Sequence, residues 1–148
     1  MRRNKGFTLI ELLVVIAIIG LLSSVVMASL NSARDKGKVA AVQSNLTQLM
    51  SSVELAFGDL GDYSTVCGNA TVIRHIDAAK AAAGVTAATV VADDTAQTTT
   101  TAVCRDQTVS WVVTVPVKNA TADYFCVDSA GRKIRTATAL PDASFQCP

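Results

Sequence analysis

The sequence predicts an α+β protein in which a long amino-terminal helix packs on a small antiparallel β-sheet. The first half of the helix is indicated by an apolar run at residues 7–30, and the second half by apolar residues recurring every three or four positions over residues 31–58. Strands are indicated after residue 108, where β-branched and aromatic residues cluster between turn residues. A long helix followed by neighbouring short strands is typical of an α+β domain.

Composition narrows the class of protein. The chain has 148 residues, enough for one ordinary domain. Of these, 50% are hydrophobic and 17% are charged, below the roughly 25% charged residues of a typical soluble domain. This composition excludes a disordered chain, and a net charge of +1 excludes a protein that coats polyanions. Residues 12–22 contain no polar side chain, so the chain divides into a membrane-seeking segment and a head.

The amino-terminal segment predicts a membrane span. Arg2, Arg3 and Lys5 precede the apolar run, with no acidic residue among them. As a helix rising about 1.5 Å per residue, residues 7–30 extend roughly 36 Å, enough to cross a hydrocarbon core of about 30 Å. Basic residues before the span and few charges after it predict a cytoplasmic amino terminus and an exported head. A secretory signal peptide would have a shorter apolar core.

Glu11 is the one acidic residue within this apolar run. A carboxylate inside a membrane span costs on the order of 3 kcal/mol, so it is usually there for a partner. A plain single-span anchor leaves Glu11 without a role. The alternative, that Glu11 lies at the interface depth of the membrane and is hydrated, stays open on the residues alone.

The run Lys5–Leu12, which reads KGFTLIEL, carries a family resemblance. It resembles the class III signal of type IV pilins and of the pseudopilins of type II secretion, in which a short basic leader ending in Gly precedes Phe, a later Glu and a long apolar helix. The resemblance implies that a prepilin peptidase cuts between Gly6 and Phe7, removing residues 1–6 as a leader, and that Phe7 is then N-methylated. It also implies that Glu11 neutralises the Phe7 ammonium of an adjacent subunit in a filament.

The resemblance further implies a location and a set of partners. The chain would cross the inner membrane once through residues 7–30, and would then enter an extracellular filament or remain in the periplasm. Its partners would be copies of itself and other pilins, the prepilin peptidase, and an inner-membrane assembly platform with an ATPase, with DNA or a surface ligand as further partners. Many pilins have a proline near the end of the apolar helix, where this chain has Ala28. Whether the helix melts between Gly20 and Ala28 on assembly stays open.

The head, residues 31–148, is predicted to begin with the amphipathic half of the long helix, residues 31–58. One stripe of that half carries Val39, Val42, Leu46, Leu49, Val53 and Phe57. Gly58 and Gly61 are natural stops. The remaining part, residues 67–148, is expected to open with a second short helix, which Asn69 or Thr71 caps and Gly84 closes.

The rest of the head is expected to form the sheet. Residues 85–103 predict a surface connection, with one strand at residues 89–91. Residues 109–115 predict a strand ended by Pro116, with Val109, Trp111, Val113 and Val115 on one face. Residues 124–128 and 133–136 predict two further strands around a turn at residues 129–131.

The cysteines indicate disulfides rather than a metal site. Cys67, Cys104, Cys126 and Cys147 form no C-x-x-C pair, and the one histidine, His75, is distant from them in the sequence. In an exported head an even number of cysteines indicates disulfides, and four cysteines allow three connectivities. We expect Cys67–Cys104, clasping the small helix and a Thr-rich loop to the sheet. We also expect Cys126–Cys147, which resembles the carboxyl-terminal disulfide loop of many pilins.

No pattern in the chain predicts catalysis or a cofactor. There is no G-x-S-x-G motif and no Gly-rich phosphate loop, and His75 lacks a recognisable catalytic context. Arg132, Lys133 and Arg135 form a small basic cluster for DNA phosphates, with a solvated face as the alternative.

The resemblance therefore implies a non-enzymatic structural subunit of a type IV pilus-like filament, serving adhesion, motility or DNA uptake. One alternative is a pseudopilin of a type II secretion system, and a second is a single-span membrane-anchored binding protein that does not polymerise. Whether the subunit is major or minor, and what its head binds, stay open.

Overall fold

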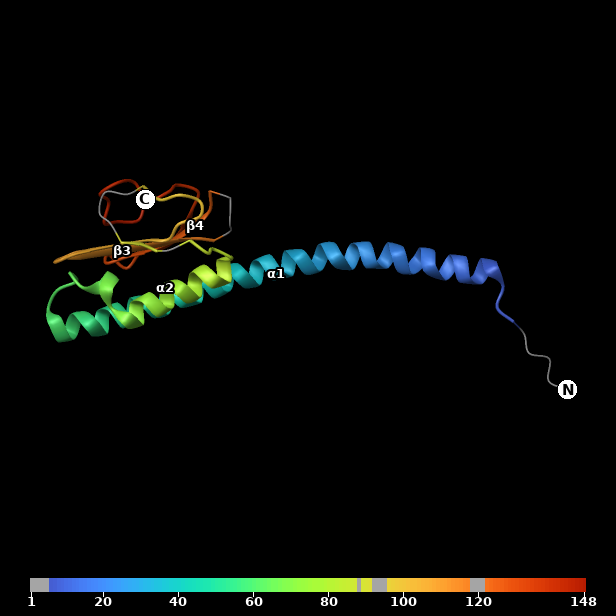
Figure 1. Ribbon diagram of the computed structural model, residues 1–148, viewed down its shortest axis with the longest axis horizontal. Helices are drawn as coiled ribbons and strands as arrows, with labels where there is room; N and C mark the ends of the chain where they lie inside the picture. The colour runs from blue at the N-terminus through green and yellow to red at the C-terminus, as the bar shows by residue number, and fades with distance from the viewer. Residues whose placement is uncertain (1–5, 88, 92–95, 118–121) are drawn as a thin grey trace. The chain divides into compact units, whose positions relative to one another are not determined.

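The computed structural model describes residues 6–87, 89–91, 96–117 and 122–148. Its elements are α1 (Leu9–Leu60), the short 3-10 helix η1 (Val66–Gly68), α2 (Ala70–Ala83), β1 (Val90–Val91), β2 (Val103–Gln107), β3 (Ser110–Pro116), β4 (Tyr124–Asp128) and β5 (Lys133–Thr136) (Figure 1). The chain forms two compact units that meet in sequence between Lys36 and Gly37. Of the expected leader, only Gly6 lies within the described residues.

The first unit contains the apolar half of α1. Every residue from Gly6 to Arg34 is exposed within this chain, including all its large apolar side chains. Among the described residues, this is the one helix long and apolar enough to cross a membrane, although a signal sequence passes the same test. A helix that is apolar all round needs a lipid or protein environment that the chain itself does not supply.

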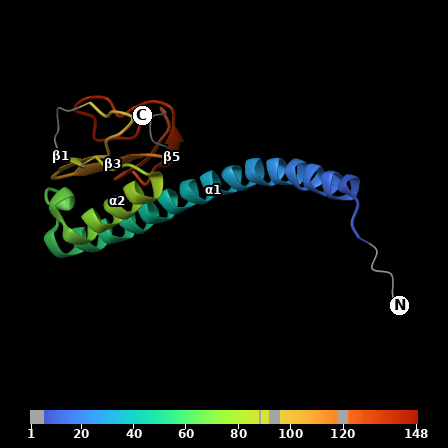
Figure 2. The ribbon, with the colours of Figure 1, turned by 45° about the vertical axis from the view of Figure 1, so that its right-hand side comes forward.

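The second unit is built on a five-stranded sheet with the order β1-β2-β3-β4-β5. β1 runs parallel to β2, and the other neighbours are antiparallel, so the four longer strands form the small antiparallel sheet that the sequence predicts. In two views the carboxyl-terminal half of α1 and all of α2 lie side by side on one face of this sheet (Figures 1 and 2). The head is thus an α+β arrangement.

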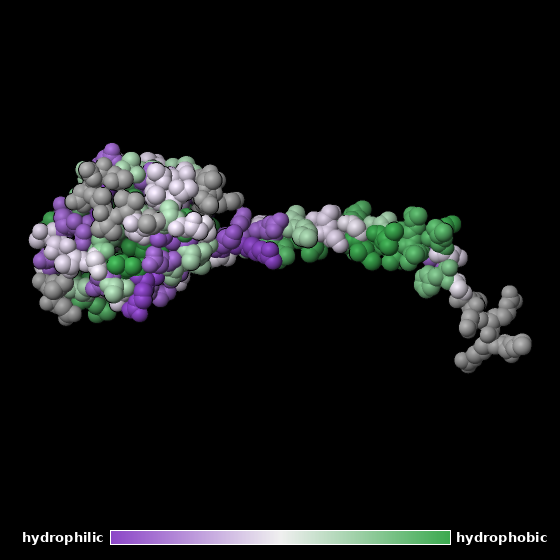
Figure 3. Space-filling view, viewed as in Figure 1, coloured by the Kyte–Doolittle hydropathy of each residue, from purple (hydrophilic) through white to green (hydrophobic). Residues whose placement is uncertain are grey.

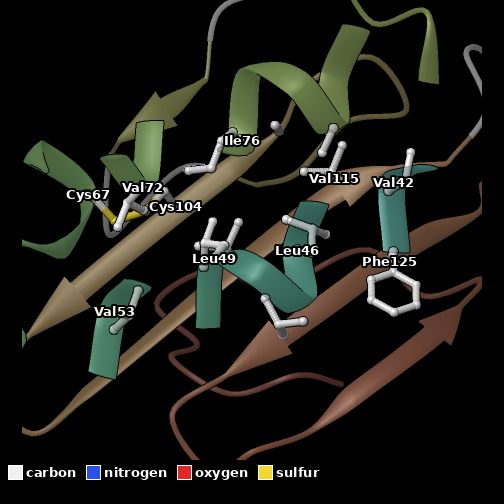
Figure 4. Packing of buried hydrophobic residues seen from close by; sticks show 14 of the residues in the cluster. Val42, Leu46, Leu49, Val53, Cys67, Val72, Ile76, Cys104, Val115 and Phe125 are labelled. Atoms are coloured by element: carbon white, nitrogen blue, oxygen red, sulfur yellow. A yellow bond between two sulfur atoms is a disulfide. The ribbon is translucent and has the colours of Figure 1, made fainter. Parts of the chain in front are cut away.

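The main core lies between these helices and the inner face of the sheet. α1 contributes a row of side chains that are fully buried, namely Val42, Leu46, Leu49 and Val53. This row faces apolar side chains of α2 and of alternate strand positions, among them Val72, Ile76, Val113, Val115 and Phe125 (Figure 4). Val39 and Phe57, expected on the same stripe, are only partly buried because they lie at its two ends.

Local signals set the helix ends. The Asn69 side chain caps α2 by accepting hydrogen bonds from the backbone N–H groups of Thr71 and Val72, at 2.8 and 3.3 Å. Gly84 closes α2 in the left-handed conformation, with φ of 75°. Gly61, with φ of 76°, follows α1 in the same way. Asn69 and Gly84 therefore act as the sequence predicts.

Aromatic contacts close the turn after α1. The rings of Phe57 and Tyr63 stack with centroids 4.4 Å apart, and the Tyr63 hydroxyl donates to the Glu54 carboxylate at 3.3 Å. Partial burial and the neighbouring Glu54 charge raise the pKa of Tyr63 above its usual value, because both disfavour the phenolate.

Two expectations for the strands need correction. Residues 103–107 form β2, whereas the sequence predicts a surface connection as far as residue 103. The sequence does not indicate this strand, because Arg105 and Asp106 have low intrinsic β-propensity. Val109 is 78% exposed in the turn between β2 and β3, so it does not share the buried face of Trp111. Pro116 is the last residue of β3 and ends the strand, as the sequence predicts. The two strands expected at residues 124–128 and 133–136 are confirmed as β4 and β5.

Two disulfides join distant parts of the head. Cys67 pairs with Cys104, which links η1 to β2, and Cys126 pairs with Cys147, which links β4 to the carboxyl-terminal tail. These are the two pairs that the sequence analysis expects. A loop-closing disulfide contributes about 3 kcal/mol in a chain-entropy account.

The outer face of the sheet is covered by the carboxyl-terminal tail, residues 137–148. Leu140 and Cys147 of the tail pack on Val103, Val112 and Cys126 of β2, β3 and β4 in a second small core. Both faces of β4 are consequently buried, which explains why all five of its residues are inaccessible. Because the tail has no regular secondary structure, its backbone N–H and C=O groups need hydrogen-bond partners outside a helix or a strand ladder.

Asp128, fully buried at the end of β4, accepts hydrogen bonds from one backbone N–H of the tail and from two N–H groups of the turn between β4 and β5. Its Oδ1 accepts from the N–H groups of Ala130 and Arg132, at 3.0 and 3.1 Å, and its Oδ2 accepts from the N–H of Cys147 at 2.9 Å. The Arg132 guanidinium in turn donates to the carbonyl of Cys147 and to the side chain of Gln146. One carboxylate therefore organises both the β4–β5 turn and the end of the tail.

Arg105 and Gln97 hold the beginning of the tail. Arg105, buried in β2, donates from Nη1 to the carbonyls of Pro141 and Ser144, at 2.6 and 3.0 Å. Gln97, also buried, accepts through Oε1 from the Leu140 N–H and from the Thr114 hydroxyl. Buried polar side chains of the sheet and of the segment before β2 thus bind backbone groups of the tail.

We expect Leu46→Ala to lower the free energy of unfolding of the head by about 2–5 kcal/mol, because it removes a fully buried side chain from the main core. Leu55→Ala is the matched control, since Leu55 lies on the same helix and is 74% exposed; we expect it to change stability by less than about 0.5 kcal/mol. Denaturant titration of the detergent-solubilised chain, followed by fluorescence of the single Trp111, measures both. Equal effects of the two variants would contradict the assigned core.

We expect Asp128→Ala to destabilise the head by about 3 kcal/mol, because three N–H groups lose a charged acceptor. Hydrogen exchange should be faster at the Cys147 and Arg132 amides but unchanged at those of α2. Asp142→Ala, at an exposed tail position, serves as the control. Unchanged exchange at Cys147 in the Asp128 variant would show that the disulfide alone holds the tail.

Candidate processing and assembly site

Thr8 and Glu11 form a capping box at the start of α1. The Thr8 hydroxyl accepts from the Glu11 N–H at 3.3 Å, and the Glu11 carboxylate accepts from the Thr8 N–H at 2.8 Å. A second bond, 2.7 Å long, runs from the Thr8 hydroxyl to the same carboxylate. This reciprocal pattern satisfies N–H groups that a helix start otherwise leaves without partners. Glu11 thus has a role within its own chain, beside the one that the resemblance implies.

The capping box also fixes where the helix begins. Gly6, Phe7 and Thr8 precede α1 without helical structure, and Phe7 is 85% exposed. The peptide bond expected to be cut, between Gly6 and Phe7, therefore lies outside the helix. A protease binds its substrate strand in extended form, and a glycine suits a position where the backbone must enter a tight cleft because it has no Cβ.

The carboxylate of Glu11 is only partly used by the box. Both bonds from Thr8 end on Oε2, and no other described residue donates to Oε1. Glu11 is exposed within this chain, as are its neighbours. Among the described residues, Oε2 thus takes part in the cap and Oε1 accepts no hydrogen bond.

An apolar surface follows the box along α1. The large side chains of this surface are 44–78% exposed from Leu9 onward, and many occupy consecutive helix positions, so they point to all sides of the helix. The face seen in Figure 3 is largely hydrophobic along this stretch. The members are Leu9, Ile10, Leu12, Leu13, Val14, Val15, Ile16, Ile18, Ile19, Leu21, Leu22, Val25, Val26, Met27 and Leu30. An apolar patch of this extent marks a membrane or protein contact. Gly20 and Ala28 lie within the continuous helix.

The other candidate residues are explained by structure within the head. His75 of α2 contacts the Ser52 hydroxyl of α1 through Nε2 at 3.3 Å, a bridge between two packed helices. Of the expected basic cluster, Arg135 is paired with Asp123, and Arg132 holds the tail. No group of three or more metal-ligating side chains occurs in the part of the chain that the structure describes.

The structure contains three functional features that the sequence analysis misses. Thr8 is one, although a Thr-x-x-Glu pattern ahead of an apolar run is a readable signal for a capping box. Asp128 and Arg105 are the others, and both hold the tail. No local pattern indicates their role, because their partners lie many residues further along the chain.

Comparisons with known proteins match part of the chain. Residues 1–27 match the family described as the prokaryotic N-terminal methylation motif. The chain is 36% identical over 62 residues to the type IV major pilin protein PilA of Myxococcus xanthus, and 40% identical over 65 residues to the type IV wide pilus major component PilA4 of Thermus thermophilus. It is 37% identical over 65 residues to the type II secretion system core protein G of Klebsiella pneumoniae.

These alignments cover less than half of this chain, at 42%, 44% and 44%, and they cover 28%, 50% and 46% of the three relatives. No solved structure matches the chain. The match to the methylation motif concerns residues 1–27, where the capping box and much of the apolar surface lie. In this motif the chain is similar to type IV pilins and to a type II secretion system core protein, and it spans half or less of the length of these relatives.

Proposed function

We propose that the chain is a structural subunit that polymerises into a type IV pilus-like filament through the apolar half of α1. The observation that carries this proposal is an apolar helix surface exposed on all sides and headed by a glutamate. Packing such helices against one another removes their apolar surface from water when subunits leave the membrane. The proposal gives the chain no enzymatic activity of its own.

The domain organisation follows from this proposal. Residues 1–6 are a leader removed by a prepilin peptidase, residues 7–30 are the membrane and assembly helix, and residues 31–148 are the exported head. The uncleaved subunit crosses the inner membrane once with its amino terminus in the cytoplasm, consistent with the basic residues at positions 2, 3 and 5. An assembly platform with an ATPase then moves the subunit into the filament.

Glu11 has two roles in this proposal. In each chain it caps α1 through Thr8, and in the filament it neutralises the Phe7 ammonium of an adjacent subunit. An unpaired charge within a bundle of apolar helices is expensive, so this pairing favours one register between subunits.

A pseudopilin of a type II secretion system is the second candidate. The relative from Klebsiella pneumoniae supports it at an identity within a few per cent of that of the two pilins. The two candidates share the amino-terminal chemistry and differ in where the filament ends, which is the cell exterior for a pilus and the periplasm for a pseudopilus. Adhesion, motility or DNA uptake belongs to the first candidate and protein secretion to the second.

We expect Glu11→Gln to abolish filament assembly while the subunit is still inserted and exported. Glutamine keeps an oxygen that accepts from the Thr8 N–H, so the cap remains and only the charge is lost. Glu11→Ala removes both and is the matched comparison. Electron microscopy of sheared fractions measures assembly, and membrane fractionation measures insertion. Filaments from the glutamine variant but not from the alanine variant would assign Glu11 to helix capping alone.

We expect intact mass spectrometry of the purified subunit to show a chain that begins at N-methylated Phe7 and is lighter by four hydrogens than its reduced form. The mass loss reports two disulfides, and the methylated terminus reports processing after Gly6. Recovery from sheared surface fibres would support the pilus, and recovery of the processed chain only from membranes would support the pseudopilus. A chain that still begins at Met1 would contradict both and leave a membrane-anchored binding protein.

A further inference from the structure

Three cations, Arg34, Lys36 and Lys38, follow the apolar run on α1. The first two belong to the same unit as the apolar run, and we name Arg34 and Lys36 the basic collar. Both are exposed and helical, and both belong to the first unit. Figure 3 shows that the apolar surface of the helix gives way to a hydrophilic band in this region.

The spacing along the helix places the collar at a defined depth if the apolar run spans a membrane. Arg34 comes four residues after Leu30 and Lys36 comes six, so they lie about 6 and 9 Å further along the helix axis. The headgroup layer on each side of a bilayer is roughly 5–7 Å thick. Long basic side chains bend along their stems to reach polar groups, which brings both charges within range of lipid phosphates.

The directions in which Arg34 and Lys36 leave α1 fit a layer of lipid headgroups around the helix better than a protein partner on one side. Residues two positions apart on a helix differ by about 200° in direction, so Arg34 and Lys36 lie on opposite sides of α1. Asp35 lies on a third side, about 100° from each. A protein that docks on one side of the helix contacts only one of the two cations, whereas lipid headgroups surround the helix and contact both.

We propose that the basic collar binds the phosphates of anionic lipids in the leaflet on the head's side of the membrane. This inference rests on the proposed insertion of residues 7–30, but not on polymerisation. Each collar cation near an anionic surface strengthens binding by about five-fold at low salt. The collar thereby fixes how deep the helix sits, and these contacts must be released when a subunit leaves the membrane.

Native mass spectrometry of the full chain in non-ionic detergent tests the proposal. Phosphatidylglycerol and phosphatidylcholine are added in equal amounts, and the lipids retained by each chain are counted. We expect the unmodified chain to retain phosphatidylglycerol in excess, and we expect R34Q/K36Q to lower this excess by about five-fold or more relative to the unmodified chain. The excess should also fall as salt is added, because ions screen exposed charges.

The control is R74Q, which removes an exposed cation of the head outside the Arg132, Lys133 and Arg135 cluster and should leave the lipid ratio unchanged. The leader cations are present in every variant, so they cancel in the comparison. An equal ratio in R34Q/K36Q and the unmodified chain would overturn the proposal. So would a loss of filaments in R34Q/K36Q without any change in lipid ratio, which would assign the collar to neighbouring subunits. Neither result depends on the Glu11 experiments, so the two proposals can fail separately.

Discussion

The row of Val42, Leu46, Leu49 and Val53 on α1 is the contact on which the head depends. A sheet of this size has an apolar face that must be covered, and this row, with α2 beside it, covers the inner face (Figure 4). Each fully buried side chain of this kind contributes about 1.5–3 kcal/mol relative to exposure. The same helix therefore serves two environments, because its earlier half is apolar all round whereas its later half is apolar only on the buried row. Substituting these four residues would therefore unfold the head but leave the apolar half of α1 unchanged.

The outer face of the sheet is covered by a different physical solution. The tail has no regular secondary structure, so its backbone groups lack ladder partners, and the sheet has buried polar side chains that equally need partners. Each supplies what the other lacks: Asp128 accepts from the Cys147 N–H, and Arg105 donates to the carbonyls of Pro141 and Ser144. The Cys126–Cys147 disulfide then limits how far the tail can separate from β4.

The parts of the fold that could be predicted from sequence are those with local signals. The buried row has a helical period, α2 has Asn69 at one end and Gly84 at the other, and β4 and β5 are short β-forming runs around a turn. β2 could not be found in this way, because the buried Arg105 donates hydrogen bonds to tail carbonyls that lie 36 or more residues further along the chain. The covering of the outer face could not be predicted either, because it depends on the same distant tail. At the candidate site, Gly6, Phe7 and Glu11 form a compact sequence pattern, and their roles stay proposals.

The capping box bears on how Glu11 could act between subunits. A free glutamate side chain loses rotamer freedom when it binds a cation, and this loss weakens the interaction. In this chain the carboxylate is already held by two hydrogen bonds from Thr8, both to Oε2, so part of that loss has occurred before any neighbour arrives. In the proposed filament, helix capping and charge pairing between subunits are then cooperative rather than competing uses of one side chain. The Glu11 carboxylate is hydrogen-bonded to Thr8, the residue that follows Phe7, so each chain presents an oriented anion near the terminus that the proposed processing would create.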